Sequence, residues 1–160
     1  MKKIKWLLLV PLLLFLVVSC APDGNGNDVV GGSLTQQING GESVVDLSGQ
    51  KFSEDASVNS GVVIKNGDFG GKTLTVNSGD VVLDNVQNVT LVISESVTSG
   101  TVTIKNSNGT SVSIVVKGGS SITIWDSAIT NVSVEKENAT VELSGDTKVT
   151  NVDVKEEGAN

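Results

Sequence analysis

Residues 81–106 read VVLDNVQNVTLVISESVTSGTVTIKN, and this stretch decides the fold class. Aliphatic residues alternate with polar ones in short runs, and Asn, Ser and Gly bound each run. Such alternation is typical of half-buried β-strands, because successive side chains of a strand point to opposite faces. After residue 20, no segment carries apolar residues at helical spacing over three turns. The sequence therefore predicts an all-β domain.

The same pattern recurs on both sides of this stretch with a period near twenty. A first family of aliphatic pairs comprises Val45/Leu47, Val62/Ile64, Val81/Leu83, Val102/Ile104, Ile122/Ile124 and Val141/Leu143. A second family lies between them and comprises Leu74/Val76, Leu91/Ile93, Val112/Ile114, Val132/Val134 and Val152/Val154. Two short strands in each repeat predict a parallel β-solenoid of about five to six coils of about 20 residues, with the pairs stacked inside. The alternative is an antiparallel β-sandwich of hairpins, which alternating strands and the Asn66-Gly67 turn also suit.

In a solenoid, successive coils lie about 4.8 Å apart, so residues at equivalent positions become neighbours and form columns. The sequence contains two such columns of interest. Two residues beyond the inner aliphatic of successive pairs stand Asn66, Asn85, Asn106 and Asp126. We expect these side chains to form an asparagine ladder that stops near both ends, where Ser-Gly follows Leu47 and Leu143. The outward column between them reads Lys65, Asp84, Lys105 and Trp125, so that opposite charges become neighbours.

This repeat resembles the right-handed parallel β-helix proteins, a broad superfamily that includes polysaccharide lyases, phage tailspikes and secreted adhesins. The resemblance spans about residues 45–155 and is one of architecture. It implies a right-handed solenoid, in agreement with the general preference for right-handed parallel crossovers.

The amino terminus has the layout of a secretory signal. Residues 1–5 read MKKIK, and an apolar run from Trp6 to Val18 follows. This run is shorter than the roughly 20 apolar residues that a membrane-spanning helix needs. Its end, Val-Val-Ser19-Cys20, resembles the lipobox of bacterial lipoproteins. The resemblance implies cleavage between Ser19 and Cys20 and a diacylglyceryl group on the Cys20 thiol.

The predicted organisation is a signal peptide at 1–19, a lipid-anchored flexible linker at 20–33 and a solenoid domain at 34–160. The linker prediction rests on a stretch rich in Gly, Asn and Asp. By the family's sorting rule, Ala21 rather than Asp after the cysteine favours the outer membrane of a Gram-negative cell. We therefore expect a cell-envelope location, with the lipid on Cys20 as the contact to the membrane.

Composition excludes several function classes. The net charge of -7 falls to about -10 once Lys2, Lys3 and Lys5 are removed, since 8 lysines then face 18 carboxylates. Every positive side chain is a lysine, so nucleic acid, whose phosphates demand neutralisation, is not an expected partner. The chain has no histidine and a single cysteine, which removes histidine-based nucleophile systems and ordinary zinc sites. We expect no catalytic residues, no metal and no cofactor.

Two functions from different classes remain. The first is a non-catalytic envelope lipoprotein with a structural, adhesive or interaction role. The second is a small carbohydrate-binding or carbohydrate-active protein, for which Trp125 is the candidate ligand contact. A side chain that merely shields neighbouring coils is the other interpretation of Trp125.

Overall fold

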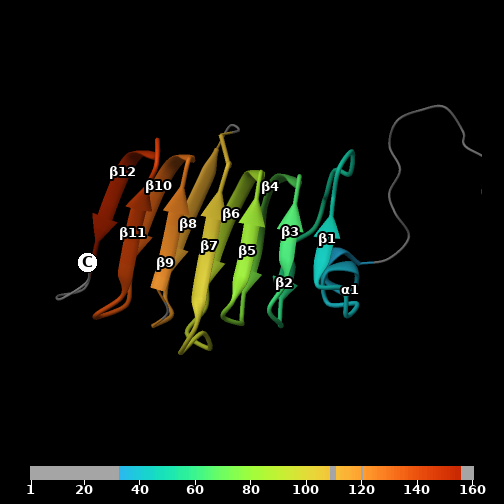
Figure 1. Cartoon of the computed structure of the whole chain (residues 1–160), viewed down its shortest axis with the longest axis horizontal. Coiled ribbons are helices and arrows are strands. Elements are labelled where there is room, and N and C mark those ends of the chain that lie inside the picture. Colours follow the sequence, from blue (N-terminus) through green and yellow to red (C-terminus); the bar gives the residue numbers. More distant parts are fainter. Residues whose placement is uncertain (1–32, 109–110, 120, 156–160) are drawn as a thin grey trace, which may run out of the picture.

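The computed structural model describes residues 33–108, 111–119 and 121–155. These residues form helix α1 (Leu34–Ile38) and twelve strands. The strands are β1 (Val44–Asp46), β2 (Ala56–Val58), β3 (Val63–Lys65), β4 (Asp68–Val76), β5 (Val81–Asp84), β6 (Gln87–Ile93), β7 (Thr101–Lys105), β8 (Val112–Val116), β9 (Ser121–Trp125), β10 (Ala128–Val134), β11 (Thr140–Ser144) and β12 (Lys148–Val154). They stack side by side into one elongated array that begins with α1 and ends with β12 (Figure 1).

The strands form two six-stranded sheets in the orders β1-β3-β5-β7-β9-β11 and β2-β4-β6-β8-β10-β12. Each strand pairs in parallel with the strand that lies two positions along the chain. A chain that alternates between two sheets in this way is a parallel β-solenoid, here of about six turns of about 19 residues over residues 44–154. The predicted solenoid is confirmed, and the antiparallel sandwich is wrong.

The aliphatic pairs form the core, as the sequence predicts. On the first sheet Ile64, Leu83, Ile104 and Ile124 pair in direct succession, and none of them is exposed. The inner residues of the second sheet face them, and they include Leu74, Leu91 and Ile114. Because an inner residue of a middle coil is covered by the coils on both sides, the middle coils contain most of the buried residues.

Three predicted registers are wrong by two residues, and in one of them Val132 pairs with Ile114 and not with Val112. Val45 pairs with Ile64 rather than with Val62. Likewise, Leu91 pairs with Ile114 and not with Val112. The two shifts at Val112 arise between β7 and β8, because Val112 follows Ile104 by eight residues, whereas its partner Val89 follows Leu83 by six. The turn after β6 is also long, with residues 94–100 in place of the four-residue connection 77–80 of the preceding coil. That longer turn places the side chain of Val97 in the core, where it is 1% exposed.

Helix α1 closes the amino-terminal end of the solenoid. Leu34 and Ile38 are buried against the first coil. Thr35 Oγ1 accepts a hydrogen bond of 3.1 Å from the Ser57 N–H, and Asn39 Nδ2 donates one of 2.8 Å to the Ser57 carbonyl. The outer edge of β2 thereby finds partners in the helix. The sequence did not predict α1, because five residues are too few to establish a helical period.

The carboxyl-terminal end differs, because its inner residues are not covered. Val141 and Leu143 on β11, and Val152 and Val154 on β12, lie in the predicted register. Leu143 is nevertheless 50% exposed, Val152 61% and Val154 52%. The expectation that these pairs are interior is therefore wrong for the last coil, which is stacked on one side alone among the described residues.

Candidate functional site

The turns after β3, β5, β7 and β9 of the first sheet are built on Asn or Asp in the left-handed backbone conformation. The φ angles are 58° for Asn66, 58° for Asn85, 53° for Asn106 and 46° for Asp126. Asn and Asp tolerate this region better than other residues with a side chain. Each main-chain N–H donates to a carbonyl of the next coil, for example from Asn66 to Asp84 at 3.0 Å. The conformation thus continues the sheet's hydrogen bonding into the turn.

The side chains at this turn also bind from coil to coil. Asn85 Nδ2 donates to Asn66 Oδ1 at 2.8 Å, and Asn66 Nδ2 donates to Asp46 Oδ1 at 3.0 Å. The predicted asparagine ladder is confirmed between Asn66 and Asn85, whereas Asp46, the acceptor for Asn66, belongs to the neighbouring outward column, in register with Lys65. Asn106 likewise donates to a carboxylate of that column and not to Asn85, since its Nδ2 binds Asp84 at 2.7 Å. Asp126 accepts from the Asp146 N–H at 2.9 Å.

The outward column beside the ladder alternates in charge as predicted. Asp46, Lys65, Asp84 and Lys105 pair in register, and Trp125 follows. Lys105 Nζ lies 3.4 Å from Asp84 Oδ2. The hydrogen bond from Asn106, with Lys105 nearby, lowers the pKa of Asp84 below its usual value. Hydrogen bonds from Ser48 and Asn66 lower the pKa of Asp46 in the same way.

A second charge cluster lies on the other sheet around Glu135. Its carboxylate binds Lys155 Nζ at 2.6 Å and lies 3.7 Å from Lys117 Nζ. The hydrogen bond from Lys155 lowers the pKa of Glu135, and the same contact raises the pKa of Lys155. Our sequence reasoning missed this cluster. The signal was present, because Lys117, Glu135 and Lys155 each follow directly after the last inward residue of their strand.

Trp125 lies on the outer face of the first sheet, between Lys105 of the previous coil and Ser144 of the next. Its side chain is among the exposed large apolar groups, at 52%. The ring also packs close to Gly145, since a Cβ atom at that glycine would lie 2.6 Å from Trp125 Cδ1. The ring therefore covers the turn of the next coil and still presents an exposed part to solvent, which is compatible with both interpretations of this residue.

The remaining predicted site residues, Ser19 and Cys20, lie outside the described residues together with the signal and most of the linker. Within the ranges that the structure describes, no helix is long and apolar enough to cross a membrane. The same ranges contain no group of three or more Cys, Asp or Glu side chains arranged to hold a metal ion.

No protein-family description matches the chain, and no curated protein or solved structure is significantly similar to it. The fold and the local geometry are therefore the observations on which a function can be argued.

Proposed function

We propose that this protein is a non-catalytic cell-envelope lipoprotein whose β-solenoid has a structural, adhesive or interaction role. The observation that carries the proposal is the state of the polar groups on the outer faces. Asp46, Asp84 and Glu135 each accept hydrogen bonds from side chains of neighbouring coils. Their pKa values are lowered, so they stay ionised at neutral pH, whereas a general acid needs a raised one. Carboxylates that are hydrogen-bonded to neighbouring coils in this way hold the coils together and form a rigid surface.

The location in the proposal rests on the amino-terminal sequence. A charged start, an apolar run and the lipobox-like Val-Val-Ser-Cys occur in the order expected of a lipoprotein signal. Lipid on Cys20 is the proposed contact with the membrane, in the outer membrane if the cell is Gram-negative. The mature charge of about -10 gives no electrostatic attraction to anionic lipid, so the lipid chains have to supply the anchoring. The proposal also includes a right-handed solenoid.

The anchor is tested by replacing Cys20 with serine in the full chain. We expect Cys20→Ser to leave the precursor uncleaved and without lipid, and Ser19→Ala, which keeps a small residue before the cysteine, to be processed as the wild type is. Intact-mass measurement of both variants distinguishes these products. Normal cleavage and lipid addition in Cys20→Ser would contradict the lipoprotein assignment.

The role itself is tested by protease treatment of intact cells, with a periplasmic protein as the control. Loss of the protein while the control survives places the solenoid on the outer face and favours adhesion. Protection of both places it inside the envelope and favours a structural role there. Recovery of the protein in the cytoplasmic fraction would exclude the envelope proposal.

The second candidate function is carbohydrate binding through Trp125. An indole that is 52% exposed beside Lys105 and Ser144 offers an apolar surface next to polar groups, which suits the face of a sugar ring. A glycan array with the wild type, Trp125→Ala and Trp125→Phe tests it. Binding that is lost in Trp125→Ala and largely kept in Trp125→Phe supports the site, and binding unaffected by either change excludes it.

A further inference from the structure

The indole of Trp125 has a free donor, and a carboxylate lies beside it. A Cβ atom at Gly145 would lie 2.7 Å from Trp125 Nε1 and would also touch Asp126 Oδ1. The nitrogen edge of the ring and the Asp126 carboxylate therefore surround one point above the turn of the next coil. Asp126 Oδ1 accepts a hydrogen bond from the Asp146 N–H, whereas Nε1 has no acceptor among the described residues.

Polar side chains surround the ring on the outer face of the first sheet. Lys105 and Ser144 pair with Trp125 in register, and Thr123 precedes it by two residues on the same strand. Thr123 in turn pairs with Glu142, so that Glu142 stands diagonally to the ring. Diagonal neighbours on one face of a sheet are within reach of aromatic and long side chains. A ligand on the ring thus meets two hydroxyl groups, one ammonium and one carboxylate.

The charge that is left for a ligand at this place is negative. The ammonium of Lys105 lies 3.4 Å from the Asp84 carboxylate, which neutralises it. Glu142 and Asp146 are exposed, and neither takes part in an ion pair within the part of the chain that the structure describes. Asp126 adds a third carboxylate, which is bound by a main-chain N–H alone.

Other lysines do not balance these three carboxylates. Lys148 follows Asp146 closely in the sequence, but it lies on β12 in register with Ala128 of the second sheet. Lys65 lies three coils before the ring, in register with Asp84. The carboxylates are not grouped as the ligands of a metal ion are. With 11 lysines against 18 carboxylates, the field of the whole chain also attracts a cation.

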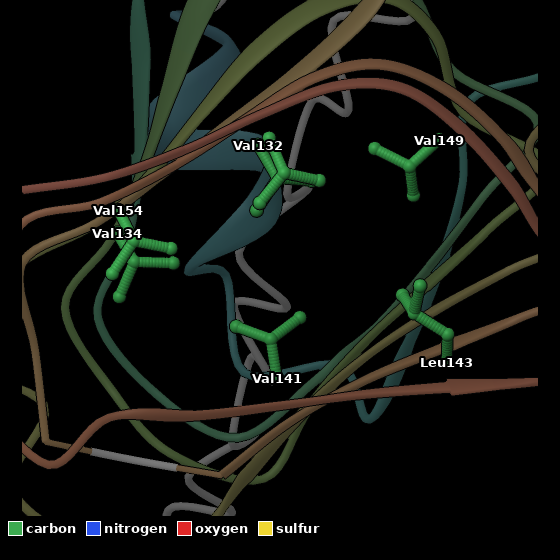
Figure 2. Close-up of a pocket in the computed structure, with 7 residues that line it drawn as sticks. Val132, Val134, Val141, Leu143, Val149 and Val154 are labelled. Atoms are coloured by element: carbon green, nitrogen blue, oxygen red, sulfur yellow. The ribbon is translucent and has the colours of Figure 1, made fainter. Parts of the chain in front are cut away.

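This site is separate from the apolar hollow at the carboxyl-terminal end. Figure 2 shows Val141 and Leu143 among the side chains that surround the hollow. Glu142 and Ser144 alternate with them on β11 and therefore point to the opposite, outer face. A substitution at Glu142 thus changes the charge near the ring and keeps the lining of the hollow.

We propose that the Trp125 site binds a cationic sugar, that is, a glycan with free, protonated amino groups. The proposal rests on the carbohydrate-binding function inferred for Trp125 above and names its sugar class. The apolar face of the sugar lies on the indole, and the ammonium is attracted by the ring and by Glu142 and Asp146. Nε1–H, Thr123 and Ser144 offer hydrogen bonds to the sugar hydroxyls, which a lysine or arginine side chain lacks. A glycan with carboxylate groups would meet like charge here.

The full chain in detergent solution is titrated calorimetrically with glucosamine oligomers and with the same oligomers after N-acetylation. Acetylation keeps the sugar ring and removes the charge, and a pH slightly below neutral keeps the free amines protonated. We expect the wild type to bind the free-amine oligomers at least about tenfold more tightly than the acetylated ones. Trp125→Ala should abolish this binding, and Trp125→Phe should keep part of it.

The carboxylates are tested by Glu142→Gln and Asp146→Asn, each of which should reduce the preference for free amines at least about threefold. Glu95→Gln is the matched control, because Glu95 is exposed, forms no ion pair among the described residues and lies in the turn that leads to β7. It removes the same charge from the chain and should bind as the wild type does. Circular dichroism checks that each variant is folded.

The outcomes separate the sugar class from the function on which it rests. Binding of acetylated oligomers that depends on Trp125 and equals that of the free amines keeps the carbohydrate function and overturns the cationic class. Binding of neither oligomer overturns both. Oligolysine that binds in a Trp125-dependent way, while the sugars do not, assigns the site to a basic protein and overturns the proposal. Equal weakening by Glu142→Gln and Glu95→Gln would assign the attraction to net charge and overturn it as well.

Discussion

The side-chain amide of Asn85 donates a hydrogen bond of 2.8 Å to the amide oxygen of Asn66, its counterpart nineteen residues earlier. Both residues adopt φ angles of 58°, so the same turn conformation is repeated one coil apart. The repeat of the sequence is thus visible as a repeat of one hydrogen bond. This relationship allows the backbone and side-chain contributions of the turn to be separated by experiment.

We predict that Asn85→Ala destabilises the protein by about 1 to 3 kcal/mol, because alanine loses the hydrogen bond to Asn66 and tolerates the left-handed conformation poorly. Asn85→Gly loses the same hydrogen bond but accepts the conformation without strain, so it should cost less. Urea unfolding midpoints of both variants measure the difference. Equal losses would mean that the backbone conformation contributes nothing measurable here.

The stack of inner residues gives a second prediction, in which position along the solenoid decides the effect. Ile104 is fully buried in a middle coil, and Leu143 occupies the equivalent inward position two coils later but is 50% exposed. We expect Ile104→Ala to cost about 2 to 5 kcal/mol through the cavity it leaves. Leu143→Ala should cost less than about 1 kcal/mol when the chain is monomeric. Unfolding at low protein concentration measures both, and a similar loss in the two variants would show that the end of the solenoid is covered.

These two positions also show what could be predicted from the sequence. The alternation around Ile104 and Leu143 identified both as inward-facing, since strand periodicity is a local property of the chain. Exposure of Leu143 depends on whether another coil follows, which no local pattern reports. The register errors at Val45 and Val112 have a related cause. The pattern shows which residues face inward, whereas the length of a connection such as the one from Ile104 to Val112 decides which inward residues become neighbours.

The candidate site, too, could be predicted from the sequence only in part. The ladder at Asn66 and Asn85 was predicted, because equal spacing puts identical side chains one coil apart. The diversion of Asn106 to Asp84 was not, because a carboxylate one residue away competes with the amide as an acceptor. Charged acceptors make shorter and stronger hydrogen bonds, and spacing alone does not contain that preference.

Two adjacent glycines yield a prediction about close packing. A Cβ atom at Gly118 would lie 2.8 Å from the Val97 carbonyl oxygen and 3.2 Å from Val97 Cβ, whereas one at Gly119 would meet only Lys136 Cε at 4.0 Å. Gly118→Ala should therefore cost about 1 to 3 kcal/mol by displacing the turn that buries Val97. Gly119→Ala is the matched control and should stay within about 0.5 kcal/mol of the wild type. Thermal and urea unfolding measure both, and a tolerated Gly118→Ala would contradict the packing of this turn.

The lowered pKa of Asp84 predicts how stability depends on pH. In the folded chain the hydrogen bond from Asn106, together with Lys105, holds this pKa below the usual 3.8. The unfolded state therefore binds the proton more tightly, so the stabilising contribution is present above pH 3.8 and is lost as the pH falls toward the folded pKa. Asp84→Asn keeps an acceptor for Asn106 but cannot titrate. We expect the variant to be less stable than the wild type at pH 7 and to lose less stability on acidification. Urea midpoints at pH 7 and at successive steps below pH 4 measure this, and parallel curves for the two proteins would show that Asp84 has the same pKa folded and unfolded.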